Sequence, residues 1–426
     1  MPWHAWGCMA IAMALPINKK LVPGFIILLS IYVIVYFIRR RRIHQPSRKL
    51  PLVVIASIFV LHLIGLFYSE HSDAAINEIG IKLSLVLFPI LAWLMPPLNN
   101  KQTKNILMSF VYGCLIFIPI AIGFGIYRAI HYHDIAYLSY EKLGIYFHPT
   151  YAATYQAMGF FILMYYASQR IYLFGKEKIH YVVCGIMLIF ISMLASKAGL
   201  IAAMISIVMS SWLFYSRKKS WSQALAVSLI SIAVLLFSTV LAPETSTRVE
   251  AAIVDFEEDT TIQNTEALNN TFQNSVSPSD STIVKVAEAK SSTQLRLVTW
   301  SAAKDVLFEN PIGTGTGDTK YALIEQYIER GENYAAEKKL NAHNQFLQYG
   351  AEFGWSGLFL ITLCIVSLIY IGFKQGEIVL LNFALLCAMN FLFESFLEVQ
   401  AGIVFFCFWI MVFSVTRKSK HNKLST

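Results

Sequence analysis

The stretch LVPGFIILLSIYVIVYFIRRRR, residues 21–42, decides the class of fold. An uncharged run at 21–38 is followed directly by four arginines. A helix needs about 20 apolar residues, or as few as about 17, to cross a bilayer. Arginines beside such a run hold that end on the cytoplasmic side. The stretch therefore predicts a transmembrane helix whose carboxyl end faces the cytoplasm.

The whole chain has the same apolar character. Of its 426 residues, 56% are hydrophobic and only 14% are charged, whereas soluble globular proteins carry roughly 25% charged residues. This composition excludes a soluble enzyme, and the apolar excess excludes disorder for most of the chain. The net charge of +8 fits basic cytoplasmic loops better than nucleic-acid binding.

The 6 cysteines all lie in apolar runs, and none forms a C-x-x-C pair. We therefore expect buried thiols rather than disulfides or metal ligands. These residues are Cys8, Cys114, Cys184, Cys364, Cys387 and Cys407.

Further apolar runs repeat along the chain and predict an all-α polytopic membrane protein with 11–12 transmembrane helices. The run 3–16 is either a twelfth span or an interfacial segment, and it lacks the basic start of a signal peptide. The eleven clearer spans are 21–38, 52–68, 81–97, 106–127, 150–167, 180–196, 198–215, 224–241, 355–373, 378–393 and 401–416.

Lysine and arginine fall on alternate loops, and the other loops carry mostly acidic residues. The positive-inside rule then places the tail 417–426 in the cytoplasm and the polar segment 242–354 outside it. We predict four regions on this basis. They are the amino-terminal helices 1–241, the large outer loop 242–354, the carboxyl-terminal helices 355–416 and the tail 417–426.

The outer loop divides into two parts. Residues 257–293 are rich in Asn, Thr, Ser, Asp and Glu, which predicts a flexible segment. Residues 294–308, QLRLVTWSAAKDVLF, predict an amphipathic helix at the membrane surface, with Arg296 and Trp300 on one face.

The sequence NPIGTGTGD follows at residues 310–318. Pro311 is expected to end the helix, and Gly313, Gly315 and Gly317 to form turns. A glycine-rich loop can also approach phosphate, but no strand precedes this one and no G-K-[ST] follows, so a plain turn is the better interpretation.

Three groups near the predicted outer face could carry chemistry. Lys197 lies in LASKAGL, between two apolar spans, so it needs a partner or a cavity, or else it snorkels to the interface. Arg296 could join it in a cationic clamp for an anionic group. His343 could remove a proton near neutral pH, and Asn344 could cap the following helix. For each of the three, an ordinary surface or loop role stays open.

Other histidines predict less. His148 stands before Pro149 at the start of a span, and an interfacial histidine is the favoured interpretation, as it is for His71, His131 and His133. The outer side has no H-E-x-x-H, C-x-x-C or D-x-D cluster, so we expect no catalytic metal ion there.

Taken in order, these motifs resemble those of the O-antigen ligase/polymerase superfamily of bacterial envelope glycosyltransferases. The stretch HPTYAATY at 148–155 is similar to family members as well. The resemblance rests on Arg296-x-x-x-Trp300, on Asn310-Pro311-Ile312-Gly313 with Gly315 and Gly317, and on His343-Asn344-Gln345-Phe346-Leu347 with Glu352-Phe353-Gly354-x-x-Gly357.

The resemblance implies a GT-C-like architecture in the bacterial inner membrane, with the large loop in the periplasm. It also implies an inverting, metal-independent glycosyl transfer without a cofactor. The donor would be a glycan on undecaprenyl diphosphate, and the acceptor in ligases is a sugar hydroxyl of lipid A–core. Membrane lipids are the other implied partners, and no nucleic acid is expected.

Carried over residue by residue, His343 matches the essential histidine of the family and Arg296 matches its loop arginine. The family's other arginine sits in a Ser-Arg-Gly-like motif, and here the matching stretch is Ser196-Lys197-Ala198-Gly199. Lysine keeps the charge but loses the bidentate geometry. The resemblance thus implies catalysis by His343 and Arg296, diphosphate binding by Lys197 and Arg296, and support from Trp300, Asn344, Gly313 and Gly315.

Several functions share these motifs. An O-antigen or exopolysaccharide polymerase and a protein O-oligosaccharyltransferase would use the same donor chemistry with a different acceptor. A flippase or transporter for the lipid-linked sugar is a different class. It would not need the outer loop with Arg296 and His343, and it should show charged residues inside several spans. Here Lys82 and Arg128 are expected at span edges.

Overall fold

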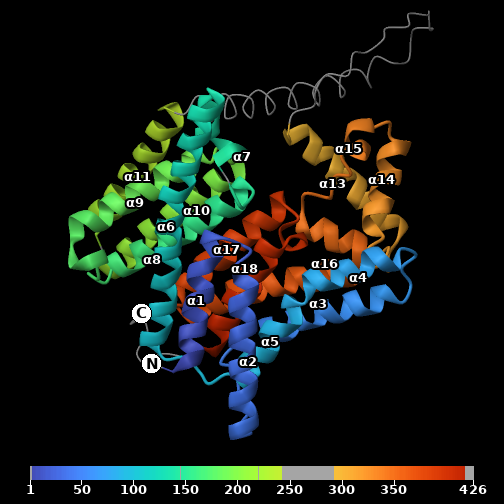
Figure 1. Ribbon diagram of the computed structural model, residues 1–426, viewed down its shortest axis with the longest axis horizontal. Helices are drawn as coiled ribbons and strands as arrows, with labels where there is room; N and C mark the ends of the chain where they lie inside the picture. Colours follow the sequence, from blue (N-terminus) through green and yellow to red (C-terminus); the bar gives the residue numbers. More distant parts are fainter. Residues whose placement is uncertain (1, 144, 219, 242–291, 418–426) are drawn as a thin grey trace, which may run out of the picture.

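The structure is a computed structural model, and it describes residues 2–143, 145–218, 220–241 and 292–417. In these residues the chain is helical, and the only β pairing is an isolated bridge between Leu98 and Thr416. This confirms the all-α polytopic class (Figure 1). The predicted flexible segment 257–293 lies almost wholly outside the described residues.

The helices follow one another along the chain from α1 to α18. They are α1 (Trp3–Ile17), α2 (Val22–Arg40), α3 (Leu50–Leu66), α4 (Ser72–Lys82), α5 (Ser84–Leu94), α6 (Asn100–Tyr132), η1 (Ile135–Leu138), α7 (Tyr140–Leu143), α8 (Pro149–Ala167), η2 (Leu173–Gly175), α9 (Glu177–Met193), α10 (Lys197–Lys218), α11 (Trp221–Leu241), α13 (Ser292–Glu309), α14 (Thr319–Glu329), α15 (Asn333–Glu337), α16 (Gln345–Lys374), α17 (Ile378–Phe393), η3 (Phe396–Glu398) and α18 (Gln400–Val415).

Each predicted span overlaps a helix, and 6 of the described helical segments are long and apolar enough to cross a membrane by length and composition. Four further apolar helices, α1, α3, α17 and α18, are shorter. The run 3–16 is therefore helical, and it packs closely along α6, because a Cβ on Gly113 would overlap the Met13 carbonyl. The six segments are Val22–Arg40, Ser72–Leu94, Asn100–Tyr132, Lys197–Arg217, Trp221–Ser238 and Gln345–Lys374.

Local signals set the start of several helices. A capping box begins α6, where the Asn99 side chain accepts from the Gln102 amide at 2.9 Å and the Gln102 side chain accepts in return. Pro149 occupies the first position of α8, where its missing N–H costs nothing. Asn344 caps α16, as predicted, by accepting from the amides of Phe346 and Leu347 at 2.9 and 3.1 Å.

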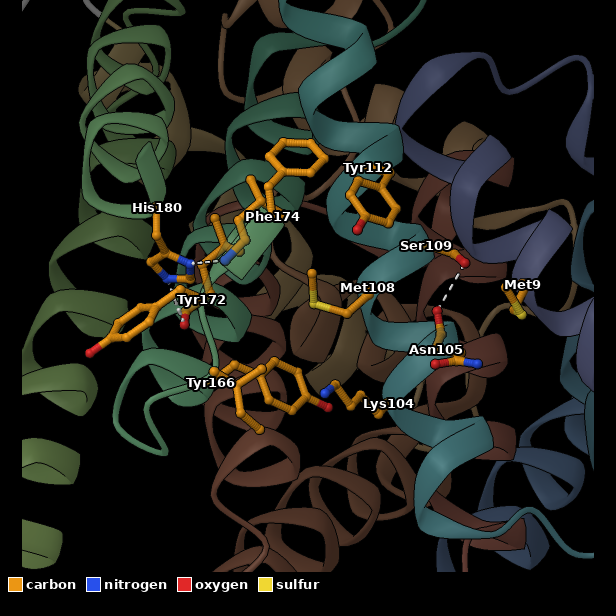
Figure 2. A pocket seen from close by; sticks show the side chains of 13 residues that line it. Met9, Lys104, Asn105, Met108, Ser109, Tyr112, Tyr166, Tyr172, Phe174 and His180 are labelled. Atoms are coloured by element: carbon orange, nitrogen blue, oxygen red, sulfur yellow. Dashed lines mark hydrogen bonds between the residues drawn. The ribbon is translucent and has the colours of Figure 1, made fainter. Parts of the chain in front are cut away.

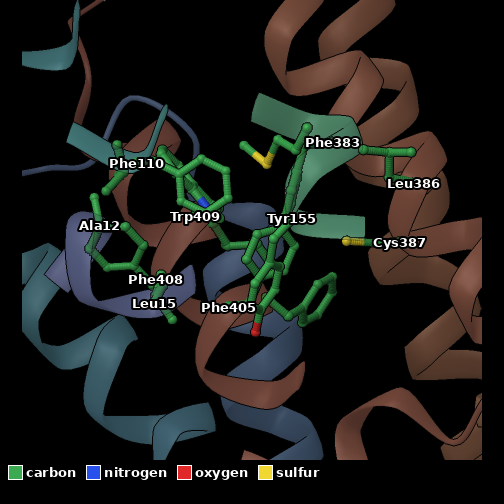
Figure 3. Close-up of a cluster of buried hydrophobic side chains, with 14 of the residues drawn as sticks. Ala12, Leu15, Phe110, Tyr155, Phe383, Leu386, Cys387, Phe405, Phe408 and Trp409 are labelled. Atoms are coloured by element: carbon green, nitrogen blue, oxygen red, sulfur yellow. The ribbon is translucent and has the colours of Figure 1, made fainter. Parts of the chain in front are cut away.

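The centre of the molecule is built around α18 and α8. Every residue of α18 from Ala401 to Val415 is buried. Tyr155 of α8 donates to the Ala401 carbonyl at 2.8 Å, and its ring lies 4.7 Å from that of Phe405. Figure 3 shows the aromatic cluster that surrounds these rings, with Phe110 and Trp409. Edge-to-face contacts of this kind stabilise a packed core.

Helices α13, α14 and α15 form a separate lobe above α16, which we call the outer lobe (Figure 1). It has its own small core, which includes Ala302, Val306, Leu323 and Tyr327. One face of α13 therefore packs against protein, although the sequence predicted a helix lying on the membrane surface.

The glycine-rich loop 310–318 connects the outer lobe to the membrane helices. Gly313, Gly315 and Gly317 all have positive φ, between 90° and 97°, which confirms the predicted turns. The amide of Gly315 donates to the Glu352 carbonyl at 3.0 Å, and that of Gly313 donates to Asn310 at 2.8 Å. Both amides are thus used within the protein, which excludes them from a phosphate cradle.

One end of the helix bundle gathers the basic loops. The buried Arg48 pairs with Glu377 at 2.8 Å and reaches the Gln375 side chain at 3.0 Å. Arg417 donates its amide to the Leu98 carbonyl at 2.9 Å. The α2–α3, α5–α6 and α16–α17 loops and the segment after α18 therefore meet at one end, and the outer lobe lies beyond the other.

The prediction for Lys82 was wrong. Its side chain is fully buried, pairs with Glu398 at 2.7 Å and donates to the Leu397 carbonyl at 3.0 Å. A buried ammonium is tolerated only with such partners. Lys82 sits where α4 meets α5, between the two halves of the segment Ser72–Leu94.

Candidate active site

Arg296 lies on the face of α13 that looks toward the end of α17. Its Nη2 donates to the Glu394 carboxylate at 3.0 Å, and its Nε donates to the Phe393 carbonyl at 3.2 Å. The side chain is 22% exposed. The third nitrogen, Nη1, donates to the Ser292 carbonyl at 3.4 Å, so all three guanidinium nitrogens have partners while part of the side chain stays exposed.

His343 lies on the other side of the same carboxylate. Its Nδ1 is 3.3 Å from the second oxygen of Glu394, and the side chain is 30% exposed. The backbone at His343 is in the left-handed region, with φ of 45°, where it leads the chain from the outer lobe into α16. Arg296, Glu394 and His343 thus form one chain of contacts, which we call the triad. With Nδ1 donating to the carboxylate, Nε2 is the atom that can accept a proton.

Glu394 was missed as a site residue. The sequence showed only an acid at the end of the span 378–393, and its two partners lie 98 and 51 residues away along the chain. Burial alone would raise the pKa of this carboxyl, but the hydrogen bond to His343 and the charges of Arg296 and His343 outweigh burial and hold the pKa below its usual value. Glu394 is therefore a carboxylate at neutral pH.

Trp300 and Asn344 hold the histidine loop in place. The Trp300 indole N–H donates to the His343 carbonyl at 3.3 Å. Asn344 caps α16 and donates from its side-chain amide to the Leu392 carbonyl at 3.2 Å. Trp300 thus contacts the backbone of His343 itself, and Asn344 contacts the backbone two residues before Glu394.

Lys197 reaches the same helix as Arg296. Its ammonium donates to the Thr293 hydroxyl at 3.1 Å, and Thr293 lies three residues before Arg296 on α13. Residues three apart share one side of a helix. The Lys197 side chain therefore contacts α13 one turn before Arg296, although the two predicted cations are 99 residues apart in sequence.

The motifs around Lys197 and His148 meet in space. The hydroxyls of Thr150 and Ser196 are 3.0 Å apart. A Cβ on Gly199 would overlap Ala153, so this glycine allows α10 to approach α8 closely. His148 also contributes to the low pKa of Glu394 through its charge. The stretches HPTYAATY and SKAG therefore form one wall beside the triad.

The predicted supporting glycines lie elsewhere. A Cβ on Gly313 would overlap the Glu352 backbone, and one on Gly315 would lie 2.9 Å from the Tyr68 ring. These residues pack the loop 310–318 against α16 and the end of α3. Thr316 donates to the His62 carbonyl at 2.8 Å, which fixes the loop further. Their contacts indicate a structural role away from the triad.

A cavity of about 340 Å³ lies between α6, α8 and α9. Figure 2 shows its aromatic and apolar walls, with Lys104 at one edge. The Lys104 ammonium lies 5.5 Å from the centre of the Tyr166 ring, a cation–π contact. No residue of the triad lines this cavity, and Lys104 lies in the second turn of α6, near the end of the bundle where the basic loops meet. The cavity is therefore not the candidate active site.

Comparison with known families bears directly on these residues. A family model described as O-Antigen ligase matches residues 182–362. The match contains Lys197, Arg296 and His343 and runs from α9 into α16. No curated protein matches the chain at a significant level. This match over residues 182–362 supports the resemblance to the O-antigen ligase/polymerase superfamily.

Proposed function

We propose that this protein is an O-antigen ligase-like glycosyltransferase that moves a glycan from undecaprenyl diphosphate to a sugar hydroxyl of lipid A–core. The match to the O-antigen ligase family model supports a glycosyltransferase-type enzyme that acts on lipid-linked glycans in the membrane. The choice of this donor and this acceptor is our proposal.

The triad is the observation that carries the proposal. Arg296 and His343 share the Glu394 carboxylate at 3.0 and 3.3 Å, and the Lys197 side chain contacts Thr293, one turn before Arg296 on α13. Two cations beside a histidine are what the transfer of a glycan from a diphosphate requires, since the leaving group is anionic and the acceptor must lose a proton.

In this mechanism the acceptor hydroxyl attacks the anomeric carbon of the donor. A bond forms between the acceptor oxygen and that carbon, and the bond from the carbon to the diphosphate oxygen breaks. Charge develops on the diphosphate, so its stabilisation matters more than its protonation. Arg296 and Lys197 would supply that charge, and a single displacement of this kind inverts the anomeric configuration.

His343 would take the proton of the acceptor hydroxyl on Nε2. Glu394 accepts from Nδ1–H, which fixes the tautomer and stabilises the imidazolium that forms, as the carboxylate does in a Ser-His-Asp triad. The donor set of the triad is one arginine, one histidine and one carboxylate that is already paired. We therefore propose that the reaction itself needs no metal ion.

We place the active site on the periplasmic side of the inner membrane, with the carboxyl terminus in the cytoplasm. Support comes from the charges: the basic loops meet at the end of the bundle away from the outer lobe, and basic loops stay in the cytoplasm. The apolar helices would hold the polyprenyl tail of the donor.

The proposal is tested in a strain that lacks the gene and carries either the wild type or His343→Ala. Loss of the general base should lower transfer by about 10²–10⁴-fold, while the variant still inserts in the membrane. Glycolipids are separated on gels, and the lipid A–core and undecaprenyl diphosphate fractions are probed separately.

The products also identify the acceptor. If long glycan accumulates on the lipid carrier in the His343→Ala strain while lipid A–core stays bare, the result supports a ligase. Single repeats on lipid A–core without long chains would indicate a polymerase instead. Near-normal transfer by His343→Ala would contradict the proposed base, and an unchanged pattern in the deletion strain would indicate a protein acceptor or another glycan.

A further inference from the structure

A second polar cluster is buried between α3, α4 and α16, outside the triad. It contains His62, Glu78 and Glu352, whose ligand atoms all lie within 4.8 Å of one another. His62 and Glu352 are completely buried, and Glu78 is 21% exposed. The proposed transfer uses none of the three, so the cluster needs an explanation of its own.

The cluster contains more acidic than basic groups. A third acid, Glu398, lies beside Glu78 and Glu352. Among these described residues the only cation is Lys82, which is 2.7 Å from Glu398 and 3.9 Å from Glu78. With His62 neutral, three ionised carboxylates and one ammonium would leave a net charge of −2, which either bound protons or a bound cation can neutralise. Buried charge of this size needs compensation. One divalent cation supplies it in full.

His62 has the orientation of a metal ligand. Its Nδ1 lies 2.9 Å from the Ile58 carbonyl, and since a carbonyl only accepts, Nδ1 carries the proton. Nε2 therefore carries no proton and has a free lone pair, and it is buried without a hydrogen-bond partner. Ligating histidines almost always donate their other ring N–H to a carbonyl or carboxylate in this way.

The distance between His62 and Glu352 also fits two ligands of one ion better than a direct hydrogen bond. Nε2 of His62 is 3.6 Å from Oε1 of Glu352, which is too long for a hydrogen bond. Two ligands at ordinary Zn–N and Zn–O distances around a tetrahedral ion lie about 3.4 Å apart. Both oxygens of Glu352 and the Tyr349 hydroxyl are likewise buried without a hydrogen-bond partner.

We infer that His62, Glu78 and Glu352 bind one divalent transition-metal ion of the Zn²⁺ or Mn²⁺ class. One imidazole and two carboxylates suit such an ion better than Mg²⁺ or Ca²⁺, which prefer oxygen alone. A water would complete the coordination, and the unpaired Tyr349 hydroxyl, whose ring lies 5.7 Å from that of His62, is the group available to hold it.

The ion has a structural role here. It ties α3 and α4 to α16 just before the helix breaks at Gly354. Glu398 connects this cluster to the active site, because it accepts from the Gln345 side chain at 3.1 Å, two residues after His343. The partial exposure of Glu78 provides the access route for the ion.

The test is the metal content of the purified full-length protein. The protein is extracted in detergent without chelator, loaded with Zn²⁺ or Mn²⁺, dialysed, and analysed by mass spectrometry of the elements. We expect about one ion per chain in the wild type and at least a fivefold loss in His62→Ala and in Glu352→Gln. Less than one ion per ten wild-type chains after loading with either metal would overturn the proposal, whether or not the variants fold.

A matched control comes from another buried histidine. Both ring nitrogens of His180 are used by backbone groups, the Leu173 amide at 2.9 Å and the Leu163 carbonyl at 3.1 Å. His180→Ala should therefore keep the ion, and equal loss in this variant would show that the metal is not held by the cluster.

Thermal unfolding of the wild type supplies an independent readout. Chelator should lower the unfolding temperature of the wild type and leave that of Glu352→Gln unchanged. If the carboxyls are protonated instead, chelator has no effect and Glu352→Gln is at least as stable as the wild type, which overturns the metal assignment. Neither readout depends on glycan transfer, so a failure here is separate from a failure of the proposed function.

Discussion

A single carboxylate, Glu394, determines how the two main site residues face each other. It accepts from Arg296 with one oxygen and from His343 with the other, and it is buried at the end of α17. Without the charge, the group that accepts from Nδ1 of His343 is a weaker acceptor and holds the tautomer less firmly. Glu394 is thus a positioning residue for the proposed base.

We predict that Glu394→Gln lowers glycan transfer at least about tenfold, since the amide keeps the shape but cannot stabilise the imidazolium. The measurement is transfer in the complemented deletion strain. Asp134→Asn is the matched control, because it removes the same charge from an exposed ion pair with Lys142 and should leave transfer unchanged. Full activity of Glu394→Gln would remove Glu394 from the site.

The pH dependence of stability follows from the low pKa of Glu394. Its pKa in the folded protein lies below the ordinary value of 4.5, so its stabilising contribution is complete above that pH. The contribution is lost as the pH falls through the lower, folded value. We expect the unfolding temperature of the wild type to fall more steeply below pH 4.5 than that of Glu394→Gln, and parallel curves would contradict this.

At this scale the sequence predicted part of the site. Arg296, His343 and Lys197 were selected from motifs and from their common side of the membrane, and the structure does bring them together. The acidic partner could not be read in the same way, because a contact between residues 296 and 394 depends on how α13 and α17 pack. The buried cluster of His62, Glu78 and Glu352 was missed for the same reason.

Helix α16 shows how an element can be continuous in sequence and broken in space. At Gly354 its backbone has φ of 64° and ψ of −150°, a region open essentially to glycine alone. The break coincides with the loop 310–318, since the Trp355 amide donates to the Pro311 carbonyl at 3.1 Å. The outer lobe is thus attached at the point where α16 changes direction.

We predict that Gly354→Ala destabilises the protein by about 1–3 kcal/mol from backbone strain alone, with a further cost because the Cβ would overlap the Pro311 carbonyl. Thermal unfolding in detergent measures the change. Gly123→Ala is the control, because that glycine lies within α6 with no atom near its Cβ position. The control should be neutral or gain up to about 1 kcal/mol, and equal stability of the two variants would argue against the strained break.

Helix positions were predictable because a continuous apolar run is a local property of the chain. The span predicted at 81–97 was less accurate: the helical segment starts at Ser72 and ends at Leu94. Glu78 and Lys82 interrupted the apolar count there, and their burial depends on Glu398, more than 300 residues away. Polar residues that pair inside the bundle therefore shift the apparent limits of a span.

The molecule as a whole is polarised along the bundle. Arg48 and the basic loops meet at one end, and the outer lobe with the triad lies beyond the other. The alternation of basic loops predicted this separation from the sequence, and it is the basis of the proposed orientation in the inner membrane.

We predict that Lys338→Cys is labelled by a membrane-impermeant maleimide in intact spheroplasts, and that Lys101→Cys is labelled only after permeabilisation. Both lysines are exposed. Lys338 directly follows α15 in the outer lobe, and Lys101 lies in the first turn of α6, at the end where the basic loops meet. All six native cysteines are buried, so the wild type serves as the background control. The reverse pattern would invert the proposed topology and place the triad in the cytoplasm.

The buried position of α18 has a consequence for how the protein is made. Among the described helices it comes last from the ribosome, yet it fills the middle of the bundle. Lys82 is synthesised long before its partners Leu397 and Glu398. The earlier helices are therefore inserted before the helix that fills the space between them exists. Until then Lys82 has its contact with Glu78, 3.9 Å away on α4, but lacks its closer partners. A chain truncated before residue 396 would leave the middle of the bundle unfilled and Lys82 without Glu398 and the Leu397 carbonyl, and we expect membrane quality-control proteases to recognise it by that exposed lysine.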